Sequence, residues 1–123
     1  MLRKLVPILA AVLLATSAAH AQMAPATKGP NGVWVDGKGM TLYVFDRDAG
    51  GKSMCNGPCA TNWPPFTAAA GAMAMGDWTI ITRDDGGKQW AYKGKPLYAW
   101  SKDAKPGDMT GDGVNNVWHA AKD

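Results

Sequence analysis

The sequence predicts an all-β fold, a small antiparallel sandwich or barrel built from two tandem β-repeats that are related by a pseudo-two-fold. The first observation is a duplicated stretch. Residues 39–48 return 55 positions later as residues 94–103, with glycine, leucine, tyrosine, a second aromatic residue and aspartate at the same offsets. The second is a series of short β-rich segments, separated by turns, between residues 78 and 101. The third is that no segment shows a sustained helical period with a capped start.

The beginning of the chain has the pattern of an export signal. Arg3 and Lys4 precede an apolar run over residues 5–18, and residues 19–21 (Ala-His-Ala) supply the small side chains of a cleavage site. This pattern predicts a secretory signal peptide over residues 1–21. The run is short for a membrane span, so we expect no transmembrane segment after cleavage. The protein is therefore expected to be periplasmic or secreted.

The rest of the composition narrows the classes of function. The formal net charge is +3, and Arg3 and Lys4 account for two of these charges, which leaves about +1 after cleavage (3 − 2). No run of Lys or Arg remains, so nothing supports nucleic-acid binding. The mature chain has no Glu and a single histidine, His119. The mature chain therefore has few side chains that could act as a general acid or base near neutral pH, and we do not expect an enzyme.

The first repeat is expected over about residues 32–77, in a single β-domain that extends to residue 123. Residues 22–31 precede it and are rich in Pro, Ala and Gly without any period, which is typical of a flexible lead-in. Two β-rich runs, residues 32–36 and 40–46, flank a Gly-Lys-Gly turn and predict a hairpin. A loop rich in Gly, Asn and Pro follows them.

The second repeat is expected over about residues 78–123. Residues 78–83 alternate in the manner of a strand, and the turns that follow return the chain through residues 88–92 and 95–101. These three strands predict an antiparallel meander. A second loop rich in Gly, Asp and Asn precedes residues 117–120, which are predicted to close the sheet.

The duplicated strands carry an aromatic and acidic motif. Side chains alternate between the two faces of a strand, and both faces are apolar here, so we expect central strands that are covered on both sides. In this interpretation each tyrosine hydroxyl binds a loop backbone group, and each aspartate forms an Asx turn that ends its strand. The alternative is a pair of aromatic walls that line a groove. The motif residues are Tyr43, Phe45, Asp48, Tyr98, Trp100 and Asp103.

Both copies resemble the Tyr-x-aromatic-x-x-Asp motif of the bacterial secreted-repeat proteins, many of which are predicted lipoproteins. The resemblance extends to residues 53–60, 63–65, 86–90 and 106–108, and so covers nearly the whole mature chain. It implies tandem β-repeats that are exported from the cytoplasm. It implies no activity, because the family is functionally uncharacterised. This chain lacks a cysteine at the cleavage point for lipid attachment.

Cys55 and Cys59 are the only cysteines, and the second repeat has no counterpart of either. In an exported protein the expected state is a disulfide, and the turn-prone residues 56–58 between them favour closure. Closing so short a loop stabilises the fold by only about 2 kcal/mol. A redox-active pair normally has Cys-x-x-Cys spacing at the start of a helix, whereas here the spacing is longer and residues 63–65 (Trp-Pro-Pro) disfavour a following helix.

A copper site is the alternative that the soft ligands of this chain suggest. Sulfur ligands suit Cu(I), and several methionines lie in loops flanked by Gly or Ala, although methionines also fill gaps in small cores. The candidate ligands are Met54, Cys55, Cys59, Met73, Met75, Met109 and His119.

A second kind of ion site involves three aspartates of the second loop, Asp103, Asp108 and Asp112. These aspartates are expected to form Asx turns, with a calcium site as the alternative.

Two hypotheses follow for the function. The first is a non-catalytic binding or interaction module of the cell envelope, which contacts an envelope protein or a small ligand and has no cofactor. The duplicated aromatic strands and six tryptophans support it. The second is a periplasmic copper-binding or redox protein that uses the Cys, Met and His ligands named above.

Overall fold

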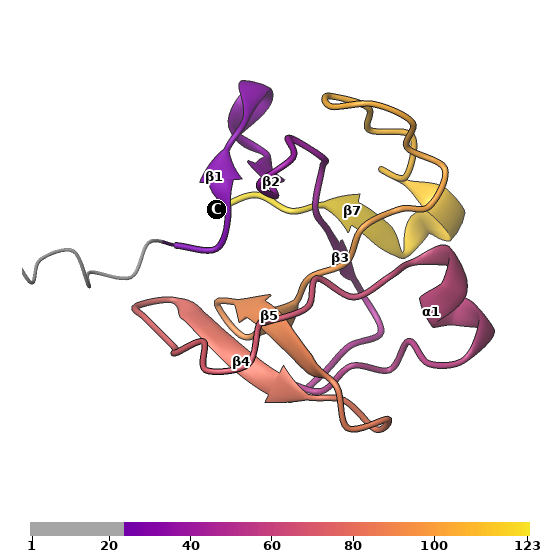
Figure 1. Cartoon of the computed structure of the whole chain (residues 1–123). Coiled ribbons are helices and arrows are strands. Elements are labelled where there is room, and N and C mark those ends of the chain that lie inside the picture. The colour runs from indigo at the N-terminus through magenta and orange to yellow at the C-terminus, as the bar shows by residue number, and fades with distance from the viewer. Residues whose placement is uncertain (1–23) are drawn as a thin grey trace, which may run out of the picture.

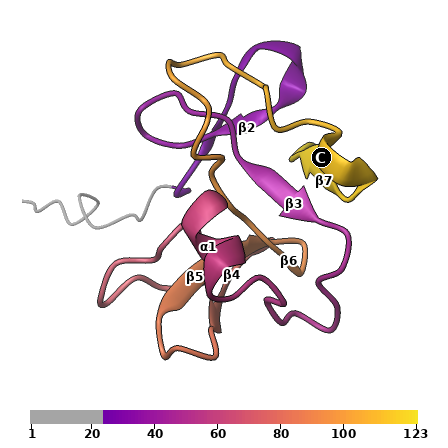
Figure 2. The same ribbon diagram turned by 90° about the vertical axis from the view of Figure 1, so that its right-hand side faces the viewer.

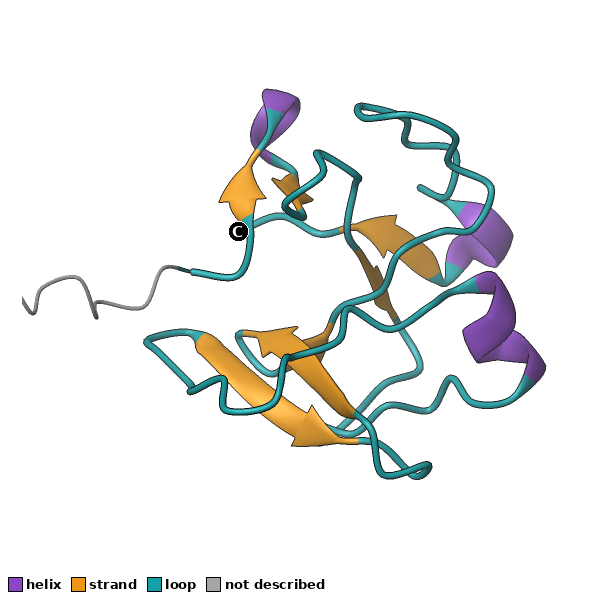
Figure 3. Cartoon of the chain, viewed as in Figure 1, coloured by secondary structure: helices purple, strands orange, loops and turns teal. Residues whose placement is uncertain are grey.

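The computed structural model of the chain describes residues 24–123, so the predicted signal peptide lies outside the described residues. Figure 1 shows the order of the elements in space, and Figure 3 separates strands from helices and loops. In chain order the elements are β1 (Thr27–Lys28), the 3₁₀ turn η2 (Pro30–Gly32), β2 (Trp34–Val35), β3 (Tyr43–Phe45), α1 (Pro58–Asn62), β4 (Trp78–Thr82), β5 (Lys88–Tyr92), β6 (Lys95–Pro96), the 3₁₀ turn η3 (Val114–Asn116) and β7 (Trp118–Ala120).

The prediction of an all-β antiparallel fold is confirmed. The described strands form a β1–β2 pair, a β3–β7 pair and a three-stranded meander in the order β4-β5-β6, and every pairing is antiparallel. The arrangement is that of a sandwich, and the strands do not close into a barrel. In Figures 1 and 2 the β1–β2 pair and the β4-β5-β6 meander lie at opposite ends of the domain, with β3 and β7 between them.

Two segments differ from the expectation. The segment described as a flexible lead-in contains β1, whose Thr27 pairs with Val35, and Ala26 beside it is buried. Pairing with β2 ties this segment down, which its Pro, Ala and Gly composition does not reveal. In the loop after β3, a five-residue helix, α1, begins at Pro58. Proline suits the first turn of a helix because its missing N–H would have no helical partner there.

The C-terminal part of each repeat pairs with the other repeat. β7 of the second repeat lies antiparallel to β3 of the first, and Pro65 of the first repeat forms a bridge to Tyr98 of the second. Tyr43 and Tyr98 meet between β7 and the segment at Pro65, and the backbone N–H of each tyrosine donates to the carbonyl of the other at 2.8 and 2.9 Å. Because these two tyrosines are counterparts in the repeat, the pseudo-two-fold passes between them.

The duplicated strands separate two hydrophobic clusters, as the alternation of apolar side chains predicts. The aromatic cluster contains Tyr43 and Tyr98 together with Val33, Cys55, Trp63, Trp118 and Ala120. The aliphatic-tryptophan cluster on the other side contains Leu42 and Leu97 together with Ala26, Trp78, Trp90 and Ala121. Both leucines and both tyrosines are fully buried, which makes these strands the centre of the fold.

Candidate functional site

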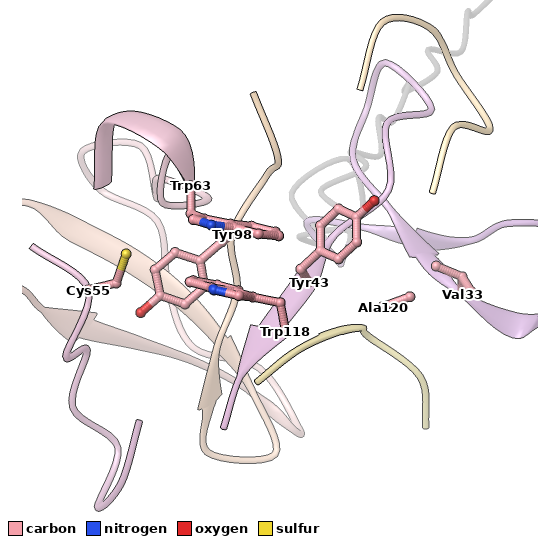
Figure 4. Packing of buried hydrophobic residues seen from close by; sticks show 7 residues of the cluster. All are labelled: Val33, Tyr43, Cys55, Trp63, Tyr98, Trp118 and Ala120. Carbon is pink, nitrogen blue, oxygen red and sulfur yellow. The ribbon is translucent and has the colours of Figure 1, made fainter. Parts of the chain in front are cut away.

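Four aromatic rings form a column that the pseudo-two-fold crosses between its two central rings. Trp63 and Trp118 stack face to face with ring centroids 3.8 Å apart, Phe45 stacks on Trp118 at 4.1 Å, and Trp100 stacks on Trp63 at 3.8 Å. Figure 4 shows the two central indoles with a tyrosine on each side. The motif rings Phe45 and Trp100 therefore stack on the core tryptophans and do not face one another across an open groove. This column gives the fold a rigid centre.

The motif tyrosines and aspartates form hydrogen bonds across the repeats. The Tyr43 hydroxyl donates to Asp103 at 2.6 Å, and the Tyr98 hydroxyl donates to Asp48 at 2.7 Å. Each aspartate also accepts a backbone N–H from the loop that follows it, which is that of Met54 for Asp48 and that of Thr110 for Asp103. The expectation that each aspartate only ends its own strand is therefore incomplete, because each one also binds the tyrosine of the other copy.

The surroundings of these pairs favour the protonated form of both tyrosine hydroxyls. Burial, followed by the hydrogen bond to the aspartate, raises the pKa of Tyr43 and of Tyr98 well above the usual tyrosine value. Burial also raises the pKa of Asp48, although the hydrogen bond from Tyr98 acts in the opposite direction. Both hydroxyls stay protonated at neutral pH, so each can donate its hydrogen bond to the aspartate of the other repeat.

Cys55 and Cys59 form the predicted disulfide, with the sulfur atoms 2.03 Å apart. Cys55 is fully buried in the aromatic cluster, and the bond joins this cluster to the first turn of α1. Disulfide sulfurs are not thiolates, so in this state the two cysteines do not offer the ligands that the copper alternative requires.

The other copper candidates are dispersed. Met109 packs against the aromatic cluster and Met75 against the aliphatic-tryptophan cluster, whereas Met54 and Met73 are exposed. His119 on β7 lies 2.8 Å from a carboxylate oxygen of Asp46. In residues 24–123 no three His, Cys, Asp or Glu side chains are grouped to hold a metal ion.

The three aspartates of the second loop bind backbone groups. Asp103 accepts from the Thr110 N–H, Asp108 from the Ala104 N–H, and Asp112 from the Ala120 N–H. Their carboxylates order the loop through bonds that span four to eight residues, which are longer than the contact with residue i+2 in the expected Asx turns.

One buried residue, Arg83, is not among the sequence-predicted site residues. Arg83 is 4% exposed and donates through Nη1 to Ser53 (2.9 Å) and Gln89 (2.8 Å), and through Nη2 to the Cys55 carbonyl (2.7 Å). The nearest ion pair is a 3.7 Å approach to Asp85, whose side chain is exposed. Alternation over the predicted strand places Arg83 on the face of Thr79, opposite Trp78 and Ile80, so the pattern does not indicate its burial.

A cavity of about 330 Å³ lies between the first hairpin and the loop before η3. Among the described residues that line it, none is charged and none is a histidine. They are Pro30, Asn31, Val33, Val35, Gly39, Thr41, Pro106, Gly107 and Met109.

Hydrogen bonds fix both walls of this cavity. On one side the Asp36 carboxylate accepts the N–H groups of Lys38 and Met40 at 2.8 and 3.0 Å. On the other side the Thr41 hydroxyl donates to the Asp108 carbonyl at 2.7 Å, and the Asp108 carboxylate caps the turn that begins at Ala104. The cavity is therefore largely preformed.

The second repeat has a polar residue at the position of Val33. Thr67 and Lys122 are counterparts in the repeat, 55 positions apart. Gln89 forms a β-bridge with Thr67 and Val33 forms one with Lys122, so Val33 and Gln89 are counterparts too. The Arg83 guanidinium binds Gln89 on one side and the segment around Ser53 on the other. This side chain occupies, in the second repeat, the space that stays open beside Val33 in the first.

Two stretches of the chain, residues 26–67 and 79–122, match the model of a family described as a secreted repeat of unknown function. The chain belongs to this family. In this secreted repeat the first match begins at Ala26 and so includes β1. No curated protein and no solved structure matches the chain. Within residues 24–123, no helix has the length and apolar character needed to cross a membrane.

Proposed function

We propose that this secreted repeat is a non-catalytic binding module that holds a small, uncharged and largely apolar ligand in the cavity beside Val33. The observation that carries the proposal is the cavity itself, because its volume of about 330 Å³ falls within the usual range for ligand sites, about 300–1,000 Å³. The difference between the two repeats also supports the proposal, since in the second repeat the Arg83 side chain occupies the space beside Gln89, the counterpart of Val33. A space that is lined by apolar groups in one copy and holds an arginine side chain in the other is the place to expect a copy-specific role.

The chemistry of the walls supports binding over catalysis. A general acid or base needs a titratable side chain within hydrogen-bond reach of the ligand, and no described lining residue supplies one. The Thr41 hydroxyl is the lining group that most resembles a nucleophile, and it already donates to the Asp108 carbonyl. Pro30, Pro106 and Met109 offer apolar contacts, and the Met109 thioether favours an aromatic ring.

The family description places such proteins outside the cytoplasm, and we propose the cell envelope, in the periplasm or beyond it, as the site of action. A concave, preformed apolar pocket fits a small ligand better than it fits the flat surface of an envelope protein. Nothing in the described residues favours the copper alternative, because its ligands are dispersed and two of them are in a disulfide.

The test is a nuclear magnetic resonance titration with three probes of similar size and different charge: benzyl alcohol, benzoate and benzylammonium. Benzyl alcohol is expected to shift the amide resonances of Asn31 and Gly107, and the two charged analogues are expected to shift them much less. The Val35→Phe variant should abolish these shifts by filling the cavity, whereas Thr79→Phe, at an exposed strand position, should preserve them. Equal shifts with all three probes, or shifts that persist in Val35→Phe, would show that the cavity is not the ligand site.

A further inference from the structure

A second, smaller pocket lies where the β5–β6 turn meets the C-terminal segment. Its volume is about 130 Å³. Its floor is apolar and consists of the buried Leu97 and Ala121 with the half-buried Val44. The remaining lining residues are polar or charged, namely Tyr92, Lys93, Lys95, Lys122 and Asp123. The pocket therefore combines an apolar base with a charged rim.

The rim carries an excess of positive charge. Among the described residues, the ammonium groups of Lys93, Lys95 and Lys122 form no ion pair within 4.0 Å. Asp123 is the one acidic residue in the lining, and its side-chain carboxylate already binds Lys28 and the Tyr92 hydroxyl. The three lysines that border the pocket thus outnumber its acidic residue.

The repeat comparison shows that the hollow belongs to one copy only. The Ala121 N–H donates to Leu42, and the Phe66 N–H donates to Leu97, so Ala121 and Phe66 are counterparts. Phe66 packs into the aliphatic-tryptophan cluster, whereas the methyl group of Ala121 leaves room above the floor. The two copies also differ in charge at the next position, because the counterpart of Lys122 is the uncharged Thr67.

We propose that this pocket binds a small carboxylate on a short aliphatic stem. The ammonium groups attract the carboxylate as point charges, and the floor removes the stem from water. The volume is about that of four waters, at roughly 30 Å³ each, which suits a ligand of about the size of butyrate. This site is separate from the cavity beside Val33 and does not depend on the function proposed there.

The experiment is a resonance titration of residues 22–123 with butyrate, acetate and butylammonium. Butyrate is expected to shift the amides of Lys95, Ala121 and Lys122. Acetate should bind more weakly because it lacks the stem, and butylammonium should not bind because it has the wrong charge. A further arm with N-acetylvaline, which imitates the C-terminus of a peptide, identifies the source of the carboxylate. If N-acetylvaline binds more tightly than butyrate, the natural ligand is the C-terminus of a peptide. If it binds more weakly, the natural ligand is a free carboxylic acid.

Three variants separate the parts of the site. Replacing both Lys95→Gln and Lys122→Gln should weaken butyrate binding by roughly two- to thirtyfold, since exposed charge pairs contribute modestly. The matched control is Lys38→Gln, because Lys38 occupies the equivalent turn of the first repeat and lies outside the pocket. Ala121→Phe introduces the residue of the counterpart position and should abolish binding without unfolding the domain.

The proposal is overturned if butyrate leaves the resonances of Lys95, Ala121 and Lys122 unchanged, or if butylammonium shifts them equally. It is also overturned if the double lysine variant binds butyrate as tightly as the Lys38→Gln control does. Should Ala121→Phe fail to fold, the double lysine variant and the charge-matched probes still decide the question, because they leave the floor of the pocket intact.

Discussion

Tyr43 and Tyr98 pair across the pseudo-two-fold, and each exchanges both backbone hydrogen bonds with the other at 2.8 and 2.9 Å. Their hydroxyls then reach outward to Asp103 and Asp48, each of which belongs to the opposite repeat. Figure 4 shows the two rings on opposite sides of the stacked Trp63 and Trp118 indoles. Because each motif is satisfied by the other copy, neither repeat forms a complete structural unit alone.

The crossed tyrosine–aspartate bonds predict a specific pattern of coupling energies. Tyr43→Phe should lower the free energy of unfolding by about 1.5–3 kcal/mol, because a hydrogen bond to a charged group is lost. In a double-mutant cycle Tyr43→Phe should couple to Asp103→Ala by about 1 kcal/mol. The same change should add to Asp48→Ala within about 0.5 kcal/mol. Urea unfolding of the three single variants, the two double variants and the parent measures both cycles.

The pattern matters more than the size of any single effect. If Tyr43 couples to Asp48, its own motif partner, and not to Asp103, the exchange between the repeats is wrong. The mirrored cycle of Tyr98 with Asp48 provides an internal control, since the pseudo-two-fold requires a similar coupling there.

The alternation of residues 42–45 was enough to predict central strands with two apolar faces, and the structure confirms it. The exchange between repeats was beyond sequence reasoning, because side-chain pattern specifies the faces of a strand and not its neighbour. The cavity beside Val33 was equally hidden, since it depends on how the loop that contains Pro106 and Met109 packs against residues 30–41. Methionine composition suggested copper, but it carries no information on where Met75 and Met109 lie in space.

All three tyrosines should resist ionisation in the folded protein. Burial raises the pKa of Tyr43 and Tyr98, and the hydrogen bond to Asp123 raises the pKa of Tyr92 to about 12. A folded pKa above the unfolded value of about 10 means that the stabilisation is complete below pH 10 and is lost as the pH rises through the folded values. Tyrosinate absorbance should therefore be absent at about pH 10 in native conditions and present in urea.

The unfolding free energy should fall over the same alkaline range. In Tyr98→Phe the unfolding free energy should fall less above about pH 10 than it does in the parent, because one tyrosine with a raised pKa has been removed. Half-ionised tyrosine in the native protein near pH 10 would contradict the assignment of these hydroxyls as donors.

Gly111 should tolerate no side chain. A Cβ at this position would lie 2.8 Å from the Trp63 ring and 3.0 Å from the Trp100 ring, within the aromatic column. Gly111→Ala is expected to lower the unfolding free energy by about 1–3 kcal/mol through overpacking. Gly37→Ala is the matched control, because nothing lies within 4 Å of its Cβ position and its change should be small. Equal thermal midpoints for the two variants would show that the column adapts without strain.

The disulfide should stabilise the fold without being essential to it. It closes a loop of only five residues, so replacing Cys55 and Cys59 together by serine should lower the unfolding free energy by about 2 kcal/mol. The serine at position 55 would be buried in the aromatic cluster, and this adds to the cost. The cavity beside Val33 has neither cysteine in its lining, so the benzyl alcohol shifts should survive in the folded variant. Reducing the parent protein provides the comparison without a buried hydroxyl. Loss of the benzyl alcohol shifts in the reduced, still folded parent would mean that the disulfide shapes the ligand site.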